Sequence, residues 1–272
     1  MSLMEERFPR PSVMGVVNVT PDSFSDGGVN FRTEDAVASA RRMVEEGAAI
    51  VDVGGESTRP GSGGVSADEE LRRVVPVLEQ LEGLPVSIDT AKAEVARRAL
   101  ELGAVLVNDV TALRGDAELA EVVASSGAFL CLMHMQGEPR TMQDSPVYED
   151  VAAEVASFLG QRLAFAVDAG IPEERICLDP GFGFGKTAEH NLQLLNRLAQ
   201  LQVLGQPILV GLSRKSLISQ VLGRPLEQRL AGGLALAATA VLHGAAIIRT
   251  HDVRETSDVV RLCAAVQREQ VQ

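Results

Sequence analysis

The feature that most restricts the fold of this sequence is a unit that recurs eight times along the chain. Each unit contains a short apolar run, a polar residue near its end, a loop and then a stretch with helical periodicity. The apolar runs lie at 13–17, 50–53, 86–88, 105–107, 129–133, 176–178, 208–210 and 246–248. Continuous aliphatic runs are typical of strands that are buried on both faces, which is the environment of a parallel sheet.

Helical patterns separate these runs. Ser66 and Glu69 form a capping-box pattern ahead of apolar residues at helical spacing, and 91–102 and 151–169 also have helical patterns. The 272 residues divided among eight units give 34 residues per unit, the repeat size of a barrel of about 250 residues. We therefore predict an α/β protein with one (β/α)8 TIM-barrel domain over 13–272, after an N-terminal extension over 1–12. A doubly wound open sheet is the alternative.

Composition narrows the class of protein. Hydrophobic residues make up 46% of the chain and charged residues 23%, which allows a large core and excludes general disorder. The net charge of −12 argues against nucleic acid and anionic membranes as partners, because both require a basic face. The three cysteines form no disulfide framework and the acidic N-terminus has no apolar signal segment, so we expect a cytoplasmic protein.

The least polar stretch, 231–248, is long enough to be checked as a membrane span. His243 and Gly244 interrupt it, and small residues dominate its composition. We expect instead a buried helix over about 232–243, then a short strand over 246–249, and no membrane insertion.

Polar side chains follow almost every predicted strand. In a barrel these positions share one rim, where barrel enzymes place their active sites. Asp89, Asn108 and Asp179 end the third, fourth and sixth strands. Carboxylates and a carboxamide suit a flat heterocycle with ring N–H and amino groups, and they reject analogues that leave them unpaired. No His-x-x-x-His or Cys-x-x-Cys spacing indicates zinc, whereas Mg²⁺ held mainly by a substrate phosphate stays open.

Basic residues follow the seventh and eighth strands, which is the usual phosphate site of such barrels. Lysine is rare in this chain, with three residues against twenty-two arginines. Lys215 lies at the strand-to-helix junction 213–216, where free amide groups favour an anion. Arg249 and His251 occupy alternating positions, so both side chains can face the same way. We predict an anion site here.

Glycine-rich loops follow three of the strands. The loops at 18–28 and 54–61 have the composition of mobile lids. The loop at 181–187 ends like a phosphate-binding loop, but Pro180 occupies the place of the leading glycine, so that motif fails. We expect Gly183 and Phe184 of this loop to lie beside a planar ligand.

These segments together resemble the bacterial dihydropteroate synthases from Val13 to the last helix. The matching segments are MGVVNVTPDSFSDGG at 14–28, DVGGESTRPG at 52–61, SIDT at 87–90, NDV at 108–110, LMHMQGEPRTMQ at 132–143, LDPGFGFGK at 178–186, GLSRKS at 211–216 and RTHDVRET at 249–256. The resemblance implies a reaction in which the amine of 4-aminobenzoate displaces diphosphate from 6-hydroxymethyl-7,8-dihydropterin diphosphate. The product would be 7,8-dihydropteroate, a folate precursor.

The resemblance also implies a role for each site residue. It assigns the pterin ring to Asp89, Asn108, Asp179 and Lys215, with Arg249 stacked on its face and Met133 and Phe184 lining the pocket. It assigns the diphosphate to Asn18, Arg249 and His251, with Mg²⁺ bridging Asn18 and the phosphate oxygens. It assigns 4-aminobenzoate to Phe24, Thr58, Arg59, Pro60 and Ser216. It further implies a homodimer formed through the later helices.

The difficult step of such a reaction is cleavage of the C–O bond, because the aromatic amine is already neutral at pH 7 and needs no strong base. By resemblance, Asp26 opposes the positive charge that develops on the pterin methylene. Lys215, Arg249 and His251 then neutralise the leaving diphosphate. Closure of the two loops would exclude water, which otherwise competes with the amine.

Other functions fit parts of the sequence. The alternative is a pterin-binding methyltransferase domain, which would use similar acids and amides but would not need the diphosphate cations or the loops at 18–28 and 54–61. An inactive binder of folate precursors would be expected to have lost Asp26, Arg59 or Lys215, and all three are present. A generic phosphate-binding barrel lyase would show no dependence on 4-aminobenzoate.

Overall fold

The computed structural model describes residues 3–20, 33–57, 63–138 and 140–270. In this part of the chain, eight parallel strands form one sheet in the order β6-β5-β4-β3-β2-β1-β8-β7. The strands are β1 (Ser12–Asn18), β2 (Ile50–Gly54), β3 (Val86–Asp89), β4 (Leu106–Asp109), β5 (Phe129–Met133), β6 (Ile176–Asp179), β7 (Leu209–Gly211) and β8 (Ile247–Thr250). A bridge between Leu178 of β6 and Ile208, beside β7, joins the two ends of this order and closes the barrel.

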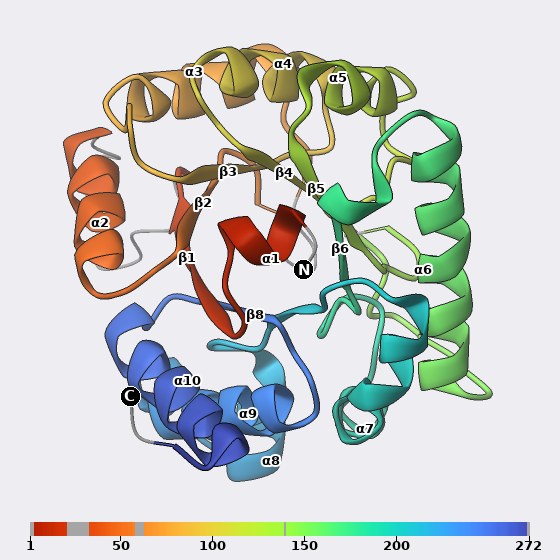
Figure 1. Ribbon diagram of the computed structural model, residues 1–272. Coiled ribbons are helices and arrows are strands. Elements are labelled where there is room, and N and C mark those ends of the chain that lie inside the picture. Colours follow the sequence, from red (N-terminus) through yellow and green to blue (C-terminus); the bar gives the residue numbers. More distant parts are fainter. Residues whose placement is uncertain (1–2, 21–32, 58–62, 139, 271–272) are drawn as a thin grey trace.

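Helices alternate with the strands, and all but the first form a ring around the barrel (Figure 1). The α-helices are α1 (Leu3–Arg7), α2 (Thr33–Glu45), α3 (Ala67–Leu78), α4 (Ala93–Glu101), α5 (Leu119–Ser126), α6 (Val151–Asp168), α7 (Ala188–Asn196), α8 (Ser216–Leu222), α9 (Leu230–Leu242) and α10 (Val253–Arg268). Short 3-10 turns are η1 (Glu173–Arg175), η2 (Leu198–Leu204) and η3 (Leu226–Gln228). The predicted (β/α)8 barrel is confirmed, and the open doubly wound sheet is excluded.

The aliphatic strands are buried because the closed sheet covers their inner face and the helices cover their outer face. Every residue of β2, β3, β4 and β6 is buried. The helices predicted over 91–102 and 151–169 are present as α4 and α6. The capping box of α3 is half formed: Ser66 Oγ accepts from the Glu69 amide at 3.2 Å, while the Glu69 carboxylate accepts from Arg73 at 2.8 Å.

The parallel register brings the polar strand ends to one opening of the barrel, which we call the carboxyl-end mouth. Strand residues that face each other across the sheet here are Asn18 and Gly54, Gly54 and Asp89, Asp89 and Asn108, Met133 and Asp179, and Gly211 and Arg249. Residues from distant parts of the chain therefore surround the same opening.

Helix α1 covers the opposite opening, which we call the amino-end mouth, and lies in the centre of Figure 1. Met4 and Phe8 are almost fully buried there, and the Phe8 ring meets Phe129 edge-on at 5.6 Å between centroids. The apolar cluster at this mouth consists of Met4, Phe8, Met14, Ile50, Leu106, Cys131, Cys177, Leu209, Ala246 and Ile247. This end of the barrel is a packed core.

The apolar stretch at 231–248 divides into a helix, α9, and a strand, β8, as predicted. The expectation that the helix is buried was wrong, because only Ala237, Ala240 and Val241 of α9 are buried. Leu242 is 53% exposed. A helix that is hydrophobic on all sides is usually buried on all sides. Because α9 is not, it presents apolar surface that the monomer leaves uncovered. Among the described helices, none is long and apolar enough to cross a membrane.

Candidate active site

An ion-pair network at the carboxyl-end mouth joins β2, β3, β4 and β8. The Arg249 guanidinium donates through Nε to Asp52 Oδ2 at 2.7 Å and through Nη2 to Asp89 Oδ2 at 2.7 Å. Asn108 Nδ2 donates to the same Asp52 oxygen at 2.9 Å. Four strands therefore contribute two acids, an amide and a guanidinium to a single cluster.

Asp52 is a site residue that the sequence analysis did not single out. Its side chain is fully buried, and its Oδ1 atom has no hydrogen-bond partner among the described residues. It lies within β2, two positions before the strand ends at Gly54. A search for polar residues at strand ends therefore misses it. The sequence did contain a signal for Asp52, namely an acid inside an aliphatic run. A buried carboxylate is costly unless it is paired, so such an acid is expected to have a partner.

Burial and neighbouring charges shift the protonation equilibria of this network. Burial raises the pKa of Asp89 to about 7, with Arg249 opposing the rise and Asp52 adding to it. Burial alone would lower the pKa of Arg249, but Asp52 and Asp89 outweigh it and the net shift is upward. Arg249 therefore stays charged, while Asp89 changes its protonation state near neutral pH.

Asp179 and Lys215 approach this network from β6 and from the start of α8. Asp179 Oδ1 accepts from the Gly181 amide at 2.7 Å, and Lys215 Nζ donates to the Phe182 carbonyl at 2.7 Å. Burial lowers the pKa of Lys215 to about 8 and raises that of Asp179, and the charge of each group opposes the shift of the other. The charge of Arg249 also opposes the rise in the pKa of Asp179. Asp179 and Lys215 therefore lie within electrostatic reach of the network formed by Arg249, Asp52 and Asp89.

An apolar wall stands beside these charges. Met133 is 3% exposed and packs with Val110, Met135, Met142 and Phe184. The Lys215 ammonium lies 4.3 Å from the centre of the Phe184 ring. Polar groups beside an aromatic and thioether wall are suited to a planar ligand with several N–H groups.

Gly183 lies next to Lys215 and has a positive φ of 78°. A Cβ atom at this position would lie 3.2 Å from Lys215 Cδ, so a larger residue would crowd the lysine. The structure thus brings together eight residues predicted from the sequence to surround the planar ligand. They are Asp89, Asn108, Met133, Asp179, Gly183, Phe184, Lys215 and Arg249.

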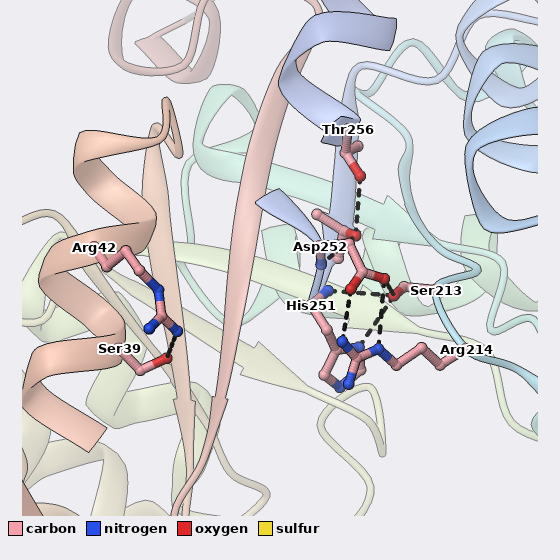
Figure 2. Close-up of polar contacts among 8 residues, drawn as sticks. Ser39, Arg42, Ser213, Arg214, His251, Asp252 and Thr256 are labelled. Carbon is pink, nitrogen blue, oxygen red and sulfur yellow. Dashed lines mark hydrogen bonds and ion pairs between the residues drawn. The ribbon is translucent and has the colours of Figure 1, made fainter. Parts of the chain in front are cut away.

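Figure 2 shows how the segments after β7 and β8 contact each other. His251 Nδ1 lies 3.2 Å from Ser213 Oγ, and the His251 amide donates to the same hydroxyl at 3.3 Å. Asp252 accepts from Arg214 Nη2 at 2.6 Å and from Ser213 Oγ at 3.4 Å. Arg249 and His251 share the rim but have different partners, since Arg249 pairs with acids of β2 and β3.

Several predicted site residues fall outside the described part of the chain. These are Phe24, Asp26, Thr58, Arg59 and Pro60, together with most of the two glycine-rich loops at 18–28 and 54–61. Two others are placed. Asn18 ends β1 at the carboxyl-end mouth, and Ser216 is the first residue of α8, directly after Lys215.

The chain is similar to known proteins over most of its length. Residues 14–251 match a family model described as pterin binding enzyme. The dihydropteroate synthase of Escherichia coli K12 is 50% identical over 258 residues, which cover 94% of this chain and 91% of that protein.

Solved structures also resemble the fold closely. Xanthomonas albilineans dihydropteroate synthase with 4-aminobenzoic acid superposes with a TM-score of 0.89 at 50% identity, covering 95% of this chain and 94% of that chain. The same enzyme in complex with 7,8-dihydropteroate gives a TM-score of 0.86 at 47% identity, with coverage of 95% and 94%.

Proposed function

The chain belongs to the dihydropteroate synthase family of pterin-binding enzymes, and from this premise we propose which of its residues carry out each part of the reaction. The reaction joins 4-aminobenzoate to 6-hydroxymethyl-7,8-dihydropterin diphosphate and releases diphosphate, which is an alkyl-group transfer in folate biosynthesis. Relatives this similar over nearly the whole chain favour this activity over the methyltransferase alternative. The ion-pair network of Arg249 with Asp52 and Asp89 is the observation on which the assignment of roles rests.

The pterin ring is held by acceptors and donors at the carboxyl-end mouth. Asp89, Asp179 and the Asn108 amide face its N–H, amino and carbonyl groups, and Met133 and Phe184 lie against its faces. Asp52 Oδ2, which accepts from Asn108 and Arg249, and the second bond of Arg249, to Asp89, orient these groups before the substrate arrives. Preorganised polar groups in a buried site discriminate strongly against ligands that lack the matching partners.

The leaving diphosphate is neutralised by the cations of the same rim. Lys215 precedes α8 beside the proposed pterin site, Arg249 lies on β8, and His251 follows that strand. The Asp26 carboxylate stabilises the positive charge that develops on the methylene as the C–O bond breaks. The neutral amine of 4-aminobenzoate then forms the C–N bond and releases one proton to the departing diphosphate or to water. Phe24, Thr58, Arg59, Pro60 and Ser216 shape the site for the second substrate.

A magnesium ion is part of this proposal. The Asn18 carboxamide oxygen is a hard ligand of the kind that Mg²⁺ accepts, at the rim where the diphosphate would lie. The described residues include no group of three His, Cys, Asp or Glu side chains that could hold a metal, so most ligands would come from the diphosphate and water. The bound ion would supply charge neutralisation for the leaving group.

The assay that tests this function follows diphosphate release from the pterin substrate with and without 4-aminobenzoate. Release that requires 4-aminobenzoate is expected, and release that ignores it would contradict the proposal. Asp26→Asn should slow turnover far more than it weakens binding of the pterin diphosphate. Equal effects on both would refute the role of Asp26.

We further propose that two copies of the chain pair through α8, α9 and α10 in the cytoplasm. Free Cys131, Cys177 and Cys263 are compatible with a reducing compartment. Exposed apolar surface marks interaction sites, and α8, η3, α9 and α10 carry more than half of the large exposed apolar side chains among the described residues. The large apolar side chains exposed here are Val221, Leu222, Leu226, Leu230, Leu242, Leu262 and Val266.

Light scattering after gel filtration tests the dimer. Leu222→Asp and Leu262→Asp should each yield a monomer, because a charge in a closely packed interface has no partner. Val147→Asp is the matched control, since Val147 is 71% exposed but lies before α6, away from this face. A wild-type monomer, or a dimer that survives both Leu substitutions, would rule out this interface.

A further inference from the structure

Lys186 directly follows the glycine-rich loop 181–185 and is one of only three lysines in the chain. In a phosphate-binding loop, a lysine at this point would reach the phosphate groups of a ligand. Here the residue is 3% exposed, and its ammonium group turns back onto its own loop. The roles proposed above leave this buried charge without a function.

The ammonium group of Lys186 has three close partners. Nζ donates to the Gly181 carbonyl at 2.9 Å and to the Phe184 carbonyl at 3.1 Å, and it lies 2.9 Å from His134 Nδ1. Because an ammonium group carries three N–H donors, these contacts use its full capacity. Lys186 is therefore committed to internal contacts with the loop and with the segment after β5.

His134 acts as an acceptor in this arrangement. Burial lowers the pKa of His134 to about 2, and the charge of Lys186 adds to the lowering, so the imidazole is neutral. Its ring packs edge-on against Phe158 at 4.9 Å between centroids, and its amide donates to the Asp179 carbonyl at 2.9 Å. Lys186 is thus anchored to a rigid side chain that is itself bonded to the backbone of a site residue.

The loop that Lys186 holds has a backbone that depends on glycine. Gly181 and Gly185 have positive φ angles of 67° and 61°. A Cβ atom at Gly181 would fall 1.9 Å from the His134 carbonyl oxygen, and one at Gly185 would fall 2.4 Å from the Gln136 carbonyl oxygen. The loop therefore lies directly against the backbone of the segment 134–136, and it has little room to shift.

The same loop also contacts Lys215. Lys215 Nζ donates to the Phe182 carbonyl and stands over the Phe184 ring, while Lys186 Nζ donates to the Gly181 and Phe184 carbonyls on either side of Phe182. The Asp179 carboxylate accepts from the Gly181 amide at the start of the loop. A change in the loop would therefore alter the positions of both Lys215 and the Phe184 ring relative to Asp179.

We propose that Lys186 is a positioning residue for the pterin site: it fixes the Gly181 and Phe184 carbonyls, and the loop so fixed holds Lys215 and Phe184 against Asp179. The inference rests on the proposed roles of Asp179, Phe184 and Lys215. Lys186 does not touch the substrate. It sets the affinity for the pterin by determining the shape of the loop.

Lys186→Met tests this inference, because methionine fills a similar volume without the three donors. We expect the Kd for the pterin diphosphate, measured by calorimetry, to rise about tenfold, the usual effect of removing a group that orients a binding residue. We expect kcat at saturating substrates to change by less than about threefold. A merely structural loss would reduce the amount of folded enzyme, and hence the apparent kcat, without changing Kd.

Two controls separate the possible outcomes. Arg175→Met likewise removes a basic side chain that donates to a backbone carbonyl, that of Gly127, but it lies at the amino end of β6, remote from this loop and from the acids of the carboxyl-end mouth. It should leave the Kd for the pterin diphosphate unchanged. Lys215→Met should abolish pterin binding in the same assay. If it does not, the proposed pterin site is wrong. If Lys215→Met abolishes binding but Lys186→Met binds normally, the proposed pterin site stands and only the inference about Lys186 fails.

His134→Phe provides a second variant if Lys186→Met does not fold. It keeps an aromatic ring against Phe158 but removes the Nδ1 acceptor, so a smaller rise in Kd, about threefold, is expected. The double variant should bind no more weakly than Lys186→Met, because both changes break the same contact. Normal pterin affinity in a folded His134→Phe variant, or fully additive effects, would overturn the proposal.

Discussion

The two mouths of this barrel are formed by opposite ends of the same eight strands, yet one is lined by apolar side chains and the other by charged ones. At the amino-end mouth, Met4 and Phe8 of the N-terminal segment complete an apolar cluster. At the carboxyl-end mouth, Asp52, Asp89 and Arg249 form a network of buried charge. One end is packed like a protein interior. The other holds paired polar groups, and among the residues that the structure describes one Asp52 oxygen has no hydrogen-bond partner.

The contrast shows how a barrel divides stability from function. Apolar contacts at one mouth contribute free energy of folding without any demand for exact chemistry. Buried charges at the other mouth are costly for folding and are retained where a ligand uses them. Substitutions at the amino-end mouth should therefore change stability alone, and substitutions at the carboxyl-end mouth should change activity first.

Arg249→Met should produce the largest effect on activity. It leaves the Asp52 and Asp89 carboxylates without their guanidinium partner and removes a cation from the leaving-group side. We expect kcat/KM for the pterin diphosphate to fall about a thousandfold, as for loss of a principal electrostatic group. Steady-state assays of diphosphate release measure this. Arg98→Gln, at an exposed position on α4, is the matched control and should retain full activity. A modest loss in Arg249→Met would contradict the assigned role.

Phe8→Ala should produce the largest effect on stability. Deletion of this buried ring from the amino-end mouth should lower the free energy of unfolding by about 3 to 4 kcal/mol. Denaturant titration gives the stability, and kcat of the folded enzyme at low temperature should match the wild type. If kcat fell while the protein stayed folded, the two mouths would not be independent and the division described above would fail.

The pH dependence of pterin binding should reflect the carboxyl-end mouth. The pKa of Asp89 is raised to about 7, so its carboxylate gains charge, and accepts pterin N–H groups better, as pH rises through that value. The pKa of Lys215 is lowered to about 8, so the ammonium loses its charge above it. Affinity should peak between these values and fall about tenfold per pH unit beyond them.

This profile is best measured with 6-hydroxymethyl-7,8-dihydropterin, because that ligand lacks the titrating diphosphate. Asp89→Asn should remove the acidic limb of the profile. An affinity that stayed constant across neutral pH would show that neither group titrates in the site. Phe8→Ala at the other mouth should leave the profile unchanged.

Ser66→Ala should have the smallest effect. It tests whether a substitution near the carboxyl-end mouth, but outside the charged network, leaves activity intact. Ser66 caps α3 through the Glu69 amide but takes no part in the charged network. Its removal should lower the free energy of unfolding by about 1 kcal/mol. Activity should be unchanged, as measured in the same diphosphate assay. A loss of activity would mean that the start of α3 shapes the site.

Much of the fold could be read from the sequence because the signals are local. Aliphatic runs followed by helical patterns recur at barrel spacing, and the structure confirms each as a strand with its helix. The polar residues Asp89, Asn108 and Asp179 were predicted because they lie at or next to the ends of strands. In a closed parallel sheet such positions meet by geometry alone.

The contributions of Asp52, Lys186 and α9 could not be read in the same way. Asp52 lies inside a strand and becomes a site residue only through Arg249, which is 197 positions away. Lys186 has the sequence context of a phosphate ligand, but its side chain turns inward. Helix α9 is as apolar as a core helix, yet only Ala237, Ala240 and Val241 of it are buried in the monomer.

Local sequence is enough to predict the barrel and the polar groups near the strand ends, since hydrophobic periodicity and strand ends are properties of neighbouring residues. The pairing of the charges, the contact of Lys215 with the Phe184 ring, the contacts of Lys186 with the loop carbonyls and the coverage of α9 depend on the folded chain. Pairing energies depend on distances of a few ångströms between residues far apart in the chain. Those distances exist only after the sheet has closed.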